Sequence, residues 1–295
     1  MRIYLDCIPC FIRQSLDAAR LATEDVHVHE QVVRGVIGLA KDLDMSQSPP
    51  VIGQQIHRLI RQLIDVEDPY HSVKQQFNNA ALKLYSRMRN LVSESKDPLE
   101  AAVRIAIAGN IIDFGLNSQL QEKVLEETID KCLFDEHAEL QIEAFRIAIN
   151  EAEEILYLTD NAGEIVFDRL LIEQLPKEKI TVAVKGSYVI NDATMKDAVV
   201  AGLPKIVEVI DNGSDAPGTI LESCSQSFRE YFNKADLIIA KGQGNYETLN
   251  DVHKNIFFVL KAKCPVISRN IGCEVGEMIL QKTKAFKGEK ENARI

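Results

Sequence analysis

The feature that most constrains the fold of this 295-residue chain is a set of five short runs, rich in β-branched or apolar residues, in its second half. Each run is too short for a helix, and about one helix length of sequence separates it from the next. The runs are residues 155–158, 180–184, 206–210, 237–240 and 256–260. Short strands that are buried on both faces and alternate with helices are typical of a parallel sheet. The sequence therefore predicts an α/β fold in which helices flank a parallel sheet.

The first half of the chain has the apolar spacing of helices instead. Apolar residues recur there with a period near 3.6, and no segment has the alternation of a strand. The predicted helices are 9–22, 31–41, 51–64, 73–92, 99–116, 119–133 and 137–150. We therefore expect an all-α N-terminal region, 1–150, that caps the cleft of an α/β domain, 151–295.

Polar turns follow four of the five apolar runs. Asp160 and Asn161 follow the first run, and Lys185, Gly186 and Ser187 follow the second. The turns after the third and fourth runs are 211–215 and 241–245. The carboxyl ends of parallel strands lie at one edge of a sheet, where such folds bind ligands. The four turns are therefore expected to meet in one cleft.

The oxygen-bearing side chains expected in this cleft suit a divalent cation. Asp160, Asn161 and Asp192 offer hard oxygen ligands. Such ligands favour Mg²⁺, Mn²⁺ or a related ion such as Co²⁺ or Ni²⁺ over a structural zinc held by thiolates. Each of these residues alone is an ordinary turn residue, so the prediction rests on their combination.

The same turns carry groups that suit a phosphate. Lys185 and Lys241 each follow a strand and would neutralise an anion. The glycines whose backbone amides can approach phosphate oxygens are Gly186, Gly213, Gly242 and Gly244. A carboxylate-held cation beside lysines and glycine-rich turns is typical of phosphoryl chemistry, because the cation polarises the phosphoryl oxygen and lowers the pKa of bound water.

The helix predicted at 99–116 is nearly all apolar, yet it carries Asn110 and Asp113 one turn apart on one face. A buried carboxylate is costly unless it is paired or binds a ligand. One interpretation is an Asn–Asp pair that caps a neighbouring helix. The other is a pair that faces the ligand, and the residues alone do not decide between them.

Cys7 and Cys10 form a C-x-x-C motif close to the N-terminus. The motif is compatible with half of a zinc site, with a redox pair, or with two buried thiols near a helix start. The chain has no second C-x-x-C and no H-x-x-x-H to complete a zinc site. A thioredoxin-like motif follows a strand, whereas this one precedes a helix. A structural or family-specific role is therefore favoured.

The charge balance excludes some classes of partner. The net charge of −10 and the pI near 5.2 give no broad basic footprint for nucleic acid and disfavour an anionic membrane surface. No apolar run approaches the ~18 residues of a spanning helix, and Arg2, Asp6 and Arg13 are unlike a signal peptide. We expect a cytoplasmic protein whose six cysteines are mostly free thiols. The sequence does not specify an oligomeric state.

Four stretches of the chain have a distinctive sequence. They are Y-L-T-D-N-A-G-E-I-V-F-D from Tyr157, V-K-G-S-Y-V-I-N-D-A-T from Val184, A-D-L-I-I-A-K-G-Q-G-N-Y-E from Ala235 and G-N-I-I-D-F-G from Gly109. Together they resemble the damage-control metal-phosphatase family, the domain-of-unknown-function family numbered 89. The segments D-C-I-P-C and L-K-A-K-C-P-V-I resemble its prokaryotic subgroup with an N-terminal C-x-x-C. The likeness covers essentially the whole chain.

This resemblance implies a helical N-terminal part over a Rossmann-like α/β domain. It also implies a metal-dependent phosphatase that acts on small phosphorylated metabolites, such as sugar phosphates and related damaged or side-product compounds. By motif, Asp160, Asn161 and Asp192 would be the metal ligands. The residues that would line the phosphate and substrate pocket are Glu164, Asn110, Asp113 and Lys241. The resemblance thus favours the ligand-facing interpretation of Asn110 and Asp113.

The expected mechanism is hydrolysis by a water molecule. The substrate phosphate would bridge the metal and Lys241, and Gly186, Ser187 and Gly242 would contribute further phosphate contacts. Asp113 or Glu164 would orient the water for in-line attack. A covalent aspartyl-phosphate on Asp160 is the alternative. It is disfavoured because Ala162 stands where enzymes of the haloacid-dehalogenase type carry a second acid.

Two other functions fit parts of the sequence. Lys241-Gly242-Gln243-Gly244 follows a strand as a dinucleotide fingerprint would, which suggests a nucleotide-binding oxidoreductase. The match is poor, because Glu247 replaces the third glycine and the strand is the fourth in order. The second alternative is a protein that binds a metal or a phosphorylated metabolite in the same cleft without catalysis.

Overall fold

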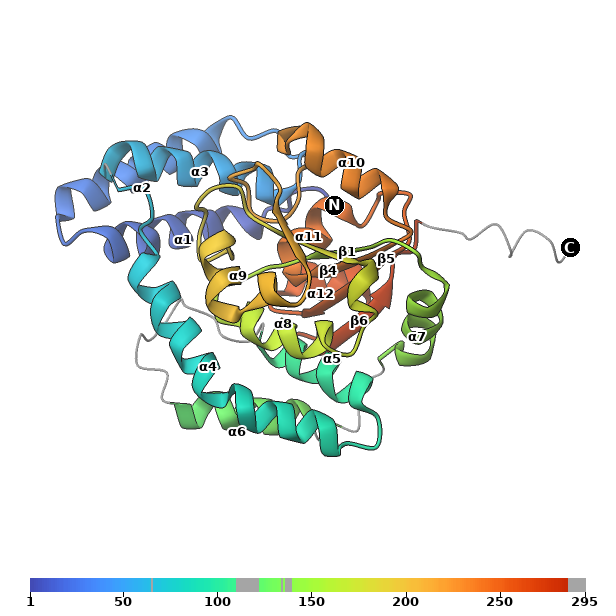
Figure 1. Cartoon of the computed structure of the whole chain (residues 1–295). Coiled ribbons are helices and arrows are strands. Elements are labelled where there is room, and N and C mark those ends of the chain that lie inside the picture. Colours follow the sequence, from blue (N-terminus) through green and yellow to red (C-terminus); the bar gives the residue numbers. More distant parts are fainter. Residues whose placement is uncertain (65, 110–121, 134, 136–139, 286–295) are drawn as a thin grey trace, which may run out of the picture.

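The sheet predicted from the sequence is the centre of the molecule. A computed structural model describes residues 1–64, 66–109, 122–133, 135 and 140–285, apart from the side chains of residues 122–126 and 128 (Figure 1). Its strands are β1 Ile155–Leu158, β2 Ile180–Val184, β3 Glu208–Asp211, β4 Leu237–Lys241, β5 Ile256–Lys261 and β6 Met278–Lys282. They form one sheet in the order β3-β2-β1-β4-β5-β6. Strands β1 to β5 are mutually parallel, which confirms the predicted α/β fold.

Strand β6 was not expected. It pairs antiparallel with β5 at one end of the sheet, with Val259 opposite Leu280. Its buried part is only Met278, Ile279 and Leu280, after which the strand becomes half-buried. Three apolar residues followed by Gln281 and Lys282 are too weak a pattern to predict a strand from the sequence.

Both faces of the sheet are covered by helices, as the apolar runs predicted. On one face, Tyr157 and Ile239 pack with α8 (Glu164–Ile172) and α9 (Met195–Ala201). On the other face, Leu158 and Ile238 pack with three helices. These are α10 Gln226–Lys234, α11 Gly242–Leu249 and α12 Pro265–Ile271 (Figure 1). Alternate residues of each strand therefore enter two different hydrophobic cores.

The N-terminal half is helical in its described parts, as predicted. Its helices are α1 Cys7–Ala22, α2 Val26–Lys41, α3 Pro49–Ile64, α4 His71–Glu94, α5 Pro98–Gly109, α6 Glu122–Leu133 and α7 Ile142–Glu151. The start of α5 shows why the pattern was readable: Pro98 is its first residue, and Asp97 Oδ1 accepts a hydrogen bond from the Glu100 amide at 3.1 Å.

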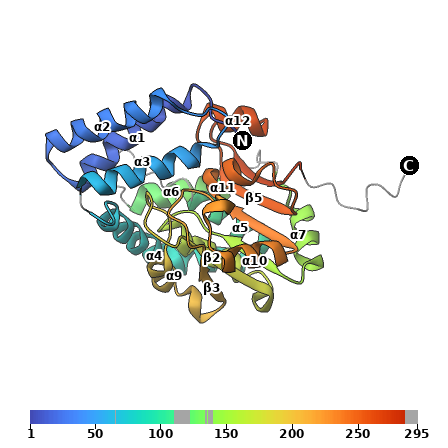
Figure 2. The same cartoon turned by 90° about the horizontal axis from the view of Figure 1, so that it is seen from above.

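The hydrophobic core does not divide at residue 150. Helices α4, α5 and α7 pack in the same core as α8 and one face of the sheet, so Ile105 and Phe145 are fully buried beside Ile239. Helices α1 to α3 form a separate cluster that lies to one side of the sheet (Figure 2). Whether 1–150 and 151–295 are independent domains stays a prediction, but α5 is part of the sheet's core and not a peripheral cap.

One carboxylate joins the α1–α3 cluster to the loop after β3. Asp215 accepts hydrogen bonds from Gln54 Nε2 at 2.7 Å, Arg58 Nε at 2.8 Å and Arg61 Nη2 at 2.6 Å, all from α3. Partial burial raises the pKa of Asp215, but the hydrogen bonds from Arg58 and Gln54 outweigh it and lower that pKa to about 2. The helical cluster is thus attached at the carboxyl edge of the sheet.

Buried His57 in α3 is expected to make the protein sensitive to acid. Burial, with a smaller effect of Arg61, lowers the pKa of His57 to about 4 from 6.5. The folded state therefore binds this proton less readily than the unfolded state, and stability is lost as pH falls from about 6.5 through 4. Between pH 7.5 and 4.5 the free energy of unfolding should fall by roughly 2–3 kcal/mol more in the parent than in His57→Gln. Urea unfolding at the two pH values measures this difference, and equal losses in both proteins would contradict it.

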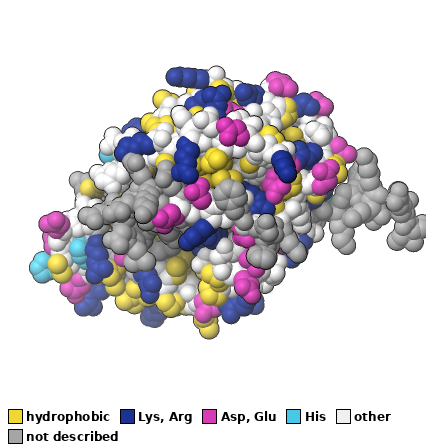
Figure 3. Space-filling view, turned by 90° about the horizontal axis from the view of Figure 1, so that it is seen from below, with side chains coloured by type: hydrophobic (Ala, Val, Ile, Leu, Met, Phe, Trp, Pro, Cys, Tyr) yellow, Lys and Arg dark blue, Asp and Glu magenta, His cyan; other side chains and the backbone are white. Residues whose placement is uncertain are grey.

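The surface and helices add two observations on partners. On the coloured part of the face in Figure 3, basic and acidic side chains are interspersed, without a basic tract of the kind that binds nucleic acid. Among the helices in the described part of the chain, none combines the length and apolar character that a membrane crossing requires.

Candidate functional site

Two turns at the carboxyl edge bring the predicted metal ligands together. Asp160 and Asn161 follow β1, and Asp192 lies in the segment between β2 and α9. Asn161 and Asp192 form an isolated antiparallel bridge. The Ala193 amide donates to the Asp160 carbonyl at 2.7 Å, and the Ala162 amide donates to the Asn191 carbonyl at 2.9 Å. The backbone therefore holds the two turns side by side.

These turns lie where the order of the strands reverses. Strand β1 pairs with β2 on one side and with β4 on the other, so that Leu158 is opposite Ala240 at its carboxyl end. The connections from β1 to β2 and from β3 to β4 run in opposite directions from this point. Open α/β sheets bind ligands at such a switch point. The sequence predicted the edge but not the strand order that singles out Asp160.

The carboxylates in these two turns are buried close to one another, which disfavours their charged forms. Burial, then repulsion from Glu164 and Asp192, raises the pKa of Asp160 well above its usual value. Burial likewise raises the pKa of Asp192 to about 6, against the opposing effect of Lys185. Glu164, at the first position of α8, has no exposed surface. A nearby cation would relieve this arrangement.

One further observation is consistent with a divalent cation bound by Asp160, Asn161 and Asp192. Asp192 Oδ2 is buried and accepts no hydrogen bond, although Lys185 Nζ lies 3.4 Å away. Asn161 Nδ2 donates to Asp160 Oδ2 at 2.7 Å and to Glu164 Oε2 at 2.9 Å, so its amide must rotate before its oxygen can face a cation. Among the described residues, no group of three His, Cys, Asp or Glu side chains could hold a metal. The predicted set has two carboxylates and one amide.

Lys241 is held differently from the prediction. It is the last residue of β4 and has no exposed surface. Its ammonium donates to Glu164 Oε1 at 2.6 Å, Asp168 Oδ1 at 2.5 Å and the Ala106 carbonyl at 2.9 Å. Burial lowers the pKa of Lys241, but Asp168 and Glu164 outweigh it and raise that pKa to about 12. All three hydrogens are committed, so in this arrangement Lys241 positions Glu164 and has none left for a phosphate.

Gly242 provides space for Asp160. It has φ +76°, and a Cβ atom there would lie 1.9 Å from Asp160 Oδ2. The Asp160 carboxylate therefore lies directly against this glycine, in the space that a side chain at position 242 would take. Gly242 also begins α11, whose first amides point toward the cleft edge and favour an anion.

Gly242→Ala is expected to displace Asp160. The added methyl group collides with its carboxylate, and the left-handed backbone costs an L-residue a further ~1–2 kcal/mol. Affinity for Mn²⁺, measured by calorimetry, should fall at least ~10-fold, the low end of what perturbing a ligand's support costs. Gly38→Ala in α2 is a matched control, since its Cβ meets nothing within 4 Å. Unchanged Mn²⁺ affinity in Gly242→Ala would show that Asp160 is not a ligand.

The second turn offers less to a phosphate than the sequence suggested. The Gly186 amide donates to the Ser214 carbonyl at 3.1 Å, and the Ser187 amide donates to the same carbonyl at 3.2 Å. A Cβ at Gly186 would lie 2.5 Å from Gly213 Cα, so close backbone packing explains this glycine. Lys185 is also buried and donates to the Gly218 carbonyl. Gly186 and Ser187 stay predictions as phosphate contacts, with the exposed Ser187 side chain the group left to make one.

Lys263 is a candidate residue that the sequence reasoning missed. It follows β5 at the same edge, is half-buried, and its backbone amide donates to Gln243 Oε1 at 2.6 Å. Its positive charge lowers the pKa of Asp160, which places the ammonium near that carboxylate. It forms no ion pair with another described residue. The rule applied to four strand ends would have found Lys263 had it been applied to the fifth.

The predicted residues Asn110 and Asp113 lie outside the described residues. Helix α5 is described to Gly109, where a Cβ atom would lie 3.0 Å from Phe167 Cδ2 and 3.4 Å from Glu164 Cα. The chain therefore enters the 110–121 segment next to Glu164. The ligand-facing role of Asn110 and Asp113 stays a prediction.

Comparison with known proteins places the chain in a family. A model of the damage-control phosphatase ARMT1-like domain matches residues 3–279. The chain belongs to this family. The resemblance inferred from the four sequence stretches is thereby confirmed.

Relatives of this damage-control phosphatase domain cover nearly the whole chain. An uncharacterised protein of Methanocaldococcus jannaschii is 39% identical over 96% of this chain and 96% of its own length. A damage-control phosphatase of Pyrococcus horikoshii is 35% identical over 96% of this chain and 99% of its own. A damage-control phosphatase of Archaeoglobus fulgidus is 36% identical over 95% and 98%. The crystal structure of a DUF89 family protein from P. horikoshii superposes with a TM-score of 0.88, at 34% identity, over 96% of this chain and all of that one.

The C-x-x-C motif of this family member lies in the first turn of α1. Cys7 is half-buried and Cys10 exposed, and both are free. Burial raises the pKa of both thiols, and Cys264 at the start of α12 adds to the effect. Cys264 therefore lies near the pair. The raised pKa values disfavour a reactive thiolate, and the structural or family-specific role of the pair stays a prediction.

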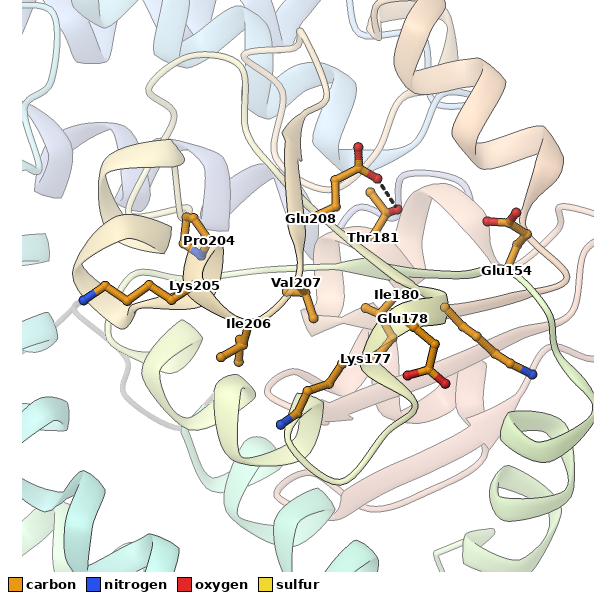
Figure 4. Close-up of a pocket in the computed structure, with 11 residues that line it drawn as sticks. Glu154, Lys177, Glu178, Ile180, Thr181, Pro204, Lys205, Ile206, Val207 and Glu208 are labelled. Carbon is orange, nitrogen blue, oxygen red and sulfur yellow. Dashed lines mark hydrogen bonds between the residues drawn. The ribbon is translucent and has the colours of Figure 1, made fainter.

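One hollow on this family member lies away from the candidate site. A cavity of about 620 Å³ lies at the opposite, amino edge of the sheet, at the starts of β2 and β3 (Figure 4). Lys177, Glu178, Lys205 and Glu208 line it, and Glu208 Oε2 accepts a hydrogen bond from Thr181 Oγ1 at 2.9 Å. Its charges are balanced, and ligands of open α/β sheets bind at the other edge. We therefore assign it no role in the site.

Proposed function

We propose that the chain is a metal-dependent phosphatase that hydrolyses small phosphorylated metabolites such as sugar phosphates. Membership of the damage-control phosphatase family supports the phosphatase class. The observation that carries the metal dependence is the crowding of carboxylates in two bridged turns, where burial and neighbouring carboxylates raise the pKa of Asp160 and of Asp192 even though Lys185 Nζ lies 3.4 Å from Asp192 Oδ2. Carboxylates buried close together are costly unless a further cation is bound.

Asp160, Asn161 and Asp192 would hold the cation, which is Mn²⁺, Mg²⁺, Co²⁺ or Ni²⁺. When bound, it supplies positive charge to the phosphoryl oxygens and lowers the pKa of a water. Lys263 and the first amides of α11 bind the remaining phosphate oxygens. Lys241 takes a supporting role, since its two carboxylate partners fix Glu164.

Hydrolysis then proceeds by direct attack of water. Glu164, with Asp113 as the second candidate, accepts the proton of the water as its oxygen forms a bond to phosphorus. The bond between phosphorus and the ester oxygen breaks, the leaving alkoxide takes up a proton from solvent water, and Glu164 returns the proton it accepted to solvent. We prefer this route to an aspartyl-phosphate on Asp160, because Ala162 leaves no second acid at the usual position. The partner of the reaction is the small phosphorylated metabolite, and a cytoplasmic location stays a prediction.

Phosphate release by metal-stripped protein tests the proposal. A panel of sugar phosphates, nucleotides and phosphopantetheine compounds would be assayed with each of the four metals and with a chelator. Release that requires metal and disappears in Asp160→Ala would establish the phosphatase. No phosphate release with any combination of substrate and metal, alongside stoichiometric metal binding, would favour a binding protein without catalysis. Equal release in chelator would reject metal dependence.

Lys263→Met is expected to raise the KM for the phosphate substrate. A charged hydrogen bond is worth about 1.5–3 kcal/mol, which corresponds to roughly a 10–100-fold loss of kcat/KM. Initial rates over a range of substrate concentrations measure this loss. The matched control is Lys177→Met, which removes an exposed lysine at the opposite edge of the sheet. Equal losses of kcat/KM in Lys263→Met and Lys177→Met would count against a phosphate contact by Lys263.

A further inference from the structure

Helix α4 contacts both turns of the candidate site through one buried amide. Asn78 is 4% exposed. Its Oδ1 accepts a hydrogen bond from the Gly163 amide at 2.7 Å, and its Nδ2 donates to Asp197 Oδ1 at 2.8 Å. Both polar atoms of the side chain are thus used, and each bonds a different turn.

The first of these partners belongs to the turn of Asp160. Gly163 is three residues after Asp160 and immediately precedes α8, which begins with Glu164. An amide at this point of a helix has no partner within the helix. Asn78 therefore supplies, from another helix, the acceptor that fixes the end of this turn.

The second partner belongs to the turn of Asp192. Asp197 Oδ2 accepts hydrogen bonds from the Thr194 amide and the Thr194 hydroxyl, both at 2.8 Å. This capping box begins α9, two residues after Asp192. Lys74, one turn before Asn78 on α4, lies 2.9 Å from Asp197 Oδ2 and compensates its charge. Asn78 thus bonds to a carboxylate that is itself fixed.

We propose that Asn78 is a positioning residue that sets the separation of the Asp160 and Asp192 turns and thereby the metal affinity of the site. The inference rests on the proposed function. The backbone bridge joins the two turns to each other, but it does not fix the points at which they lead into α8 and α9. Asn78 fixes both of these points from α4, on the buried face by which this helix packs into the core. Residues that hold ligands in this way typically change metal affinity or activity by about 10–100-fold when replaced.

The first test is hydrogen exchange in the metal-free protein. In Asn78→Ala, the Gly163 amide loses its acceptor and should exchange about 10-fold faster or more by NMR, as a locally opened amide does. Asn79→Ala, which changes the exposed neighbour on the same helix, should leave the rate unchanged. An unchanged Gly163 rate in Asn78→Ala would overturn the proposal. This readout involves neither metal nor substrate, so it is independent of the proposed function.

The second test is Mn²⁺ affinity by calorimetry. Asn78→Ala should bind Mn²⁺ about 10–100-fold more weakly, while Asn79→Ala binds as the parent does. Parent-like affinity in Asn78→Ala would overturn the positioning role even if exchange is faster. A parent that binds no Mn²⁺ would reject the metal site of the proposed function and this role with it, while faster exchange of the Gly163 amide in Asn78→Ala would still show that Asn78 fixes the turn.

A charge-swapped pair keeps the proposal testable if Asn78→Ala does not fold. In Asn78→Asp with Asp197→Asn, the new carboxylate accepts from Gly163 and from the new amide, whose oxygen accepts from Thr194. The double variant should recover Mn²⁺ affinity to within about 3-fold of the parent, whereas Asn78→Asp alone places two carboxylates together and should not. A double variant no better than the single ones would contradict the bridging geometry.

Discussion

Replacing Asp192 with alanine is expected to lower metal-dependent phosphate release by about 1,000-fold or more. The side chain contributes one of two carboxylates to the proposed cation site, and it lies in the turn bridged to Asn161. Loss of the cation forfeits several kcal/mol of charge stabilisation at the phosphoryl group, and each 1.36 kcal/mol is tenfold in rate. Initial rates at saturating Mn²⁺ measure the loss.

Stability separates this effect from misfolding. Burial raises the pKa of Asp192 to about 6 even though Lys185 Nζ lies 3.4 Å from Oδ2, so Asp192→Asn in the metal-free protein should be about as stable as the parent in urea at pH 8. Added Mn²⁺ should raise the Tm of the parent but not of the variant. Asp251→Asn is the control, because its side chain is 86% exposed and remote from the site. Turnover near that of the parent in Asp192→Ala would remove Asp192 from the ligand set.

Replacing Lys241 with methionine is expected to lower the free energy of unfolding by about 3–5 kcal/mol. The ammonium is fully buried between Glu164 and Asp168, and its removal leaves two buried carboxylates without their cation. Methionine keeps most of the volume, so the loss is electrostatic and not a cavity effect. Urea unfolding at pH 8 measures it.

Two comparisons test the electrostatic cause of that loss. Removal of the cation raises the pKa of the carboxyl groups in the folded state, so the deficit of Lys241→Met should be smaller at pH 5 than at pH 8. Adding Glu164→Gln and Asp168→Asn to Lys241→Met should restore most of the stability while activity stays lost. A deficit that is independent of pH and remains in the triple variant would mean that packing, and not charge, is responsible.

The sheet could be predicted because its strands are buried on both faces. Residues 155–158, 180–184 and 256–260 are continuous apolar runs between polar turns, and each forms a strand at nearly those bounds. The third strand was misplaced by two residues, since Glu208–Asp211 is only half-buried and exposed at both ends. The strand order was not predictable, because it depends on how the whole sheet packs and not on any local run.

Some residues of the candidate site could likewise be predicted from the sequence, and others could not. Asp160, Asn161 and Asp192 could be predicted because they follow strands, and chain direction alone brings such residues to one edge. The role of Lys241 could not, because a lysine that ends a strand can point toward the cleft or into the core. Its partner Asp168 lies one helical turn beyond Glu164, and only packing against β4 brings them together. Asn78 is 82 positions before Asp160 and carried no local signal.

The core that the sheet shares with helices α4, α5 and α7 also determines which segments could be exchanged by recombination. A mutation in α5 disturbs the same core as one in β4, so the effects of substitutions in these two segments are expected to be coupled. Helices α1 to α3 have their own core and meet the edge through Asp215, the Tyr188 carbonyl and Ile190. Natural recombination that exchanges this bundle near residue 70 would preserve both cores, whereas a crossover at residue 150 would divide one. The bundle is accordingly the part of the molecule most free to be replaced as new substrates are selected.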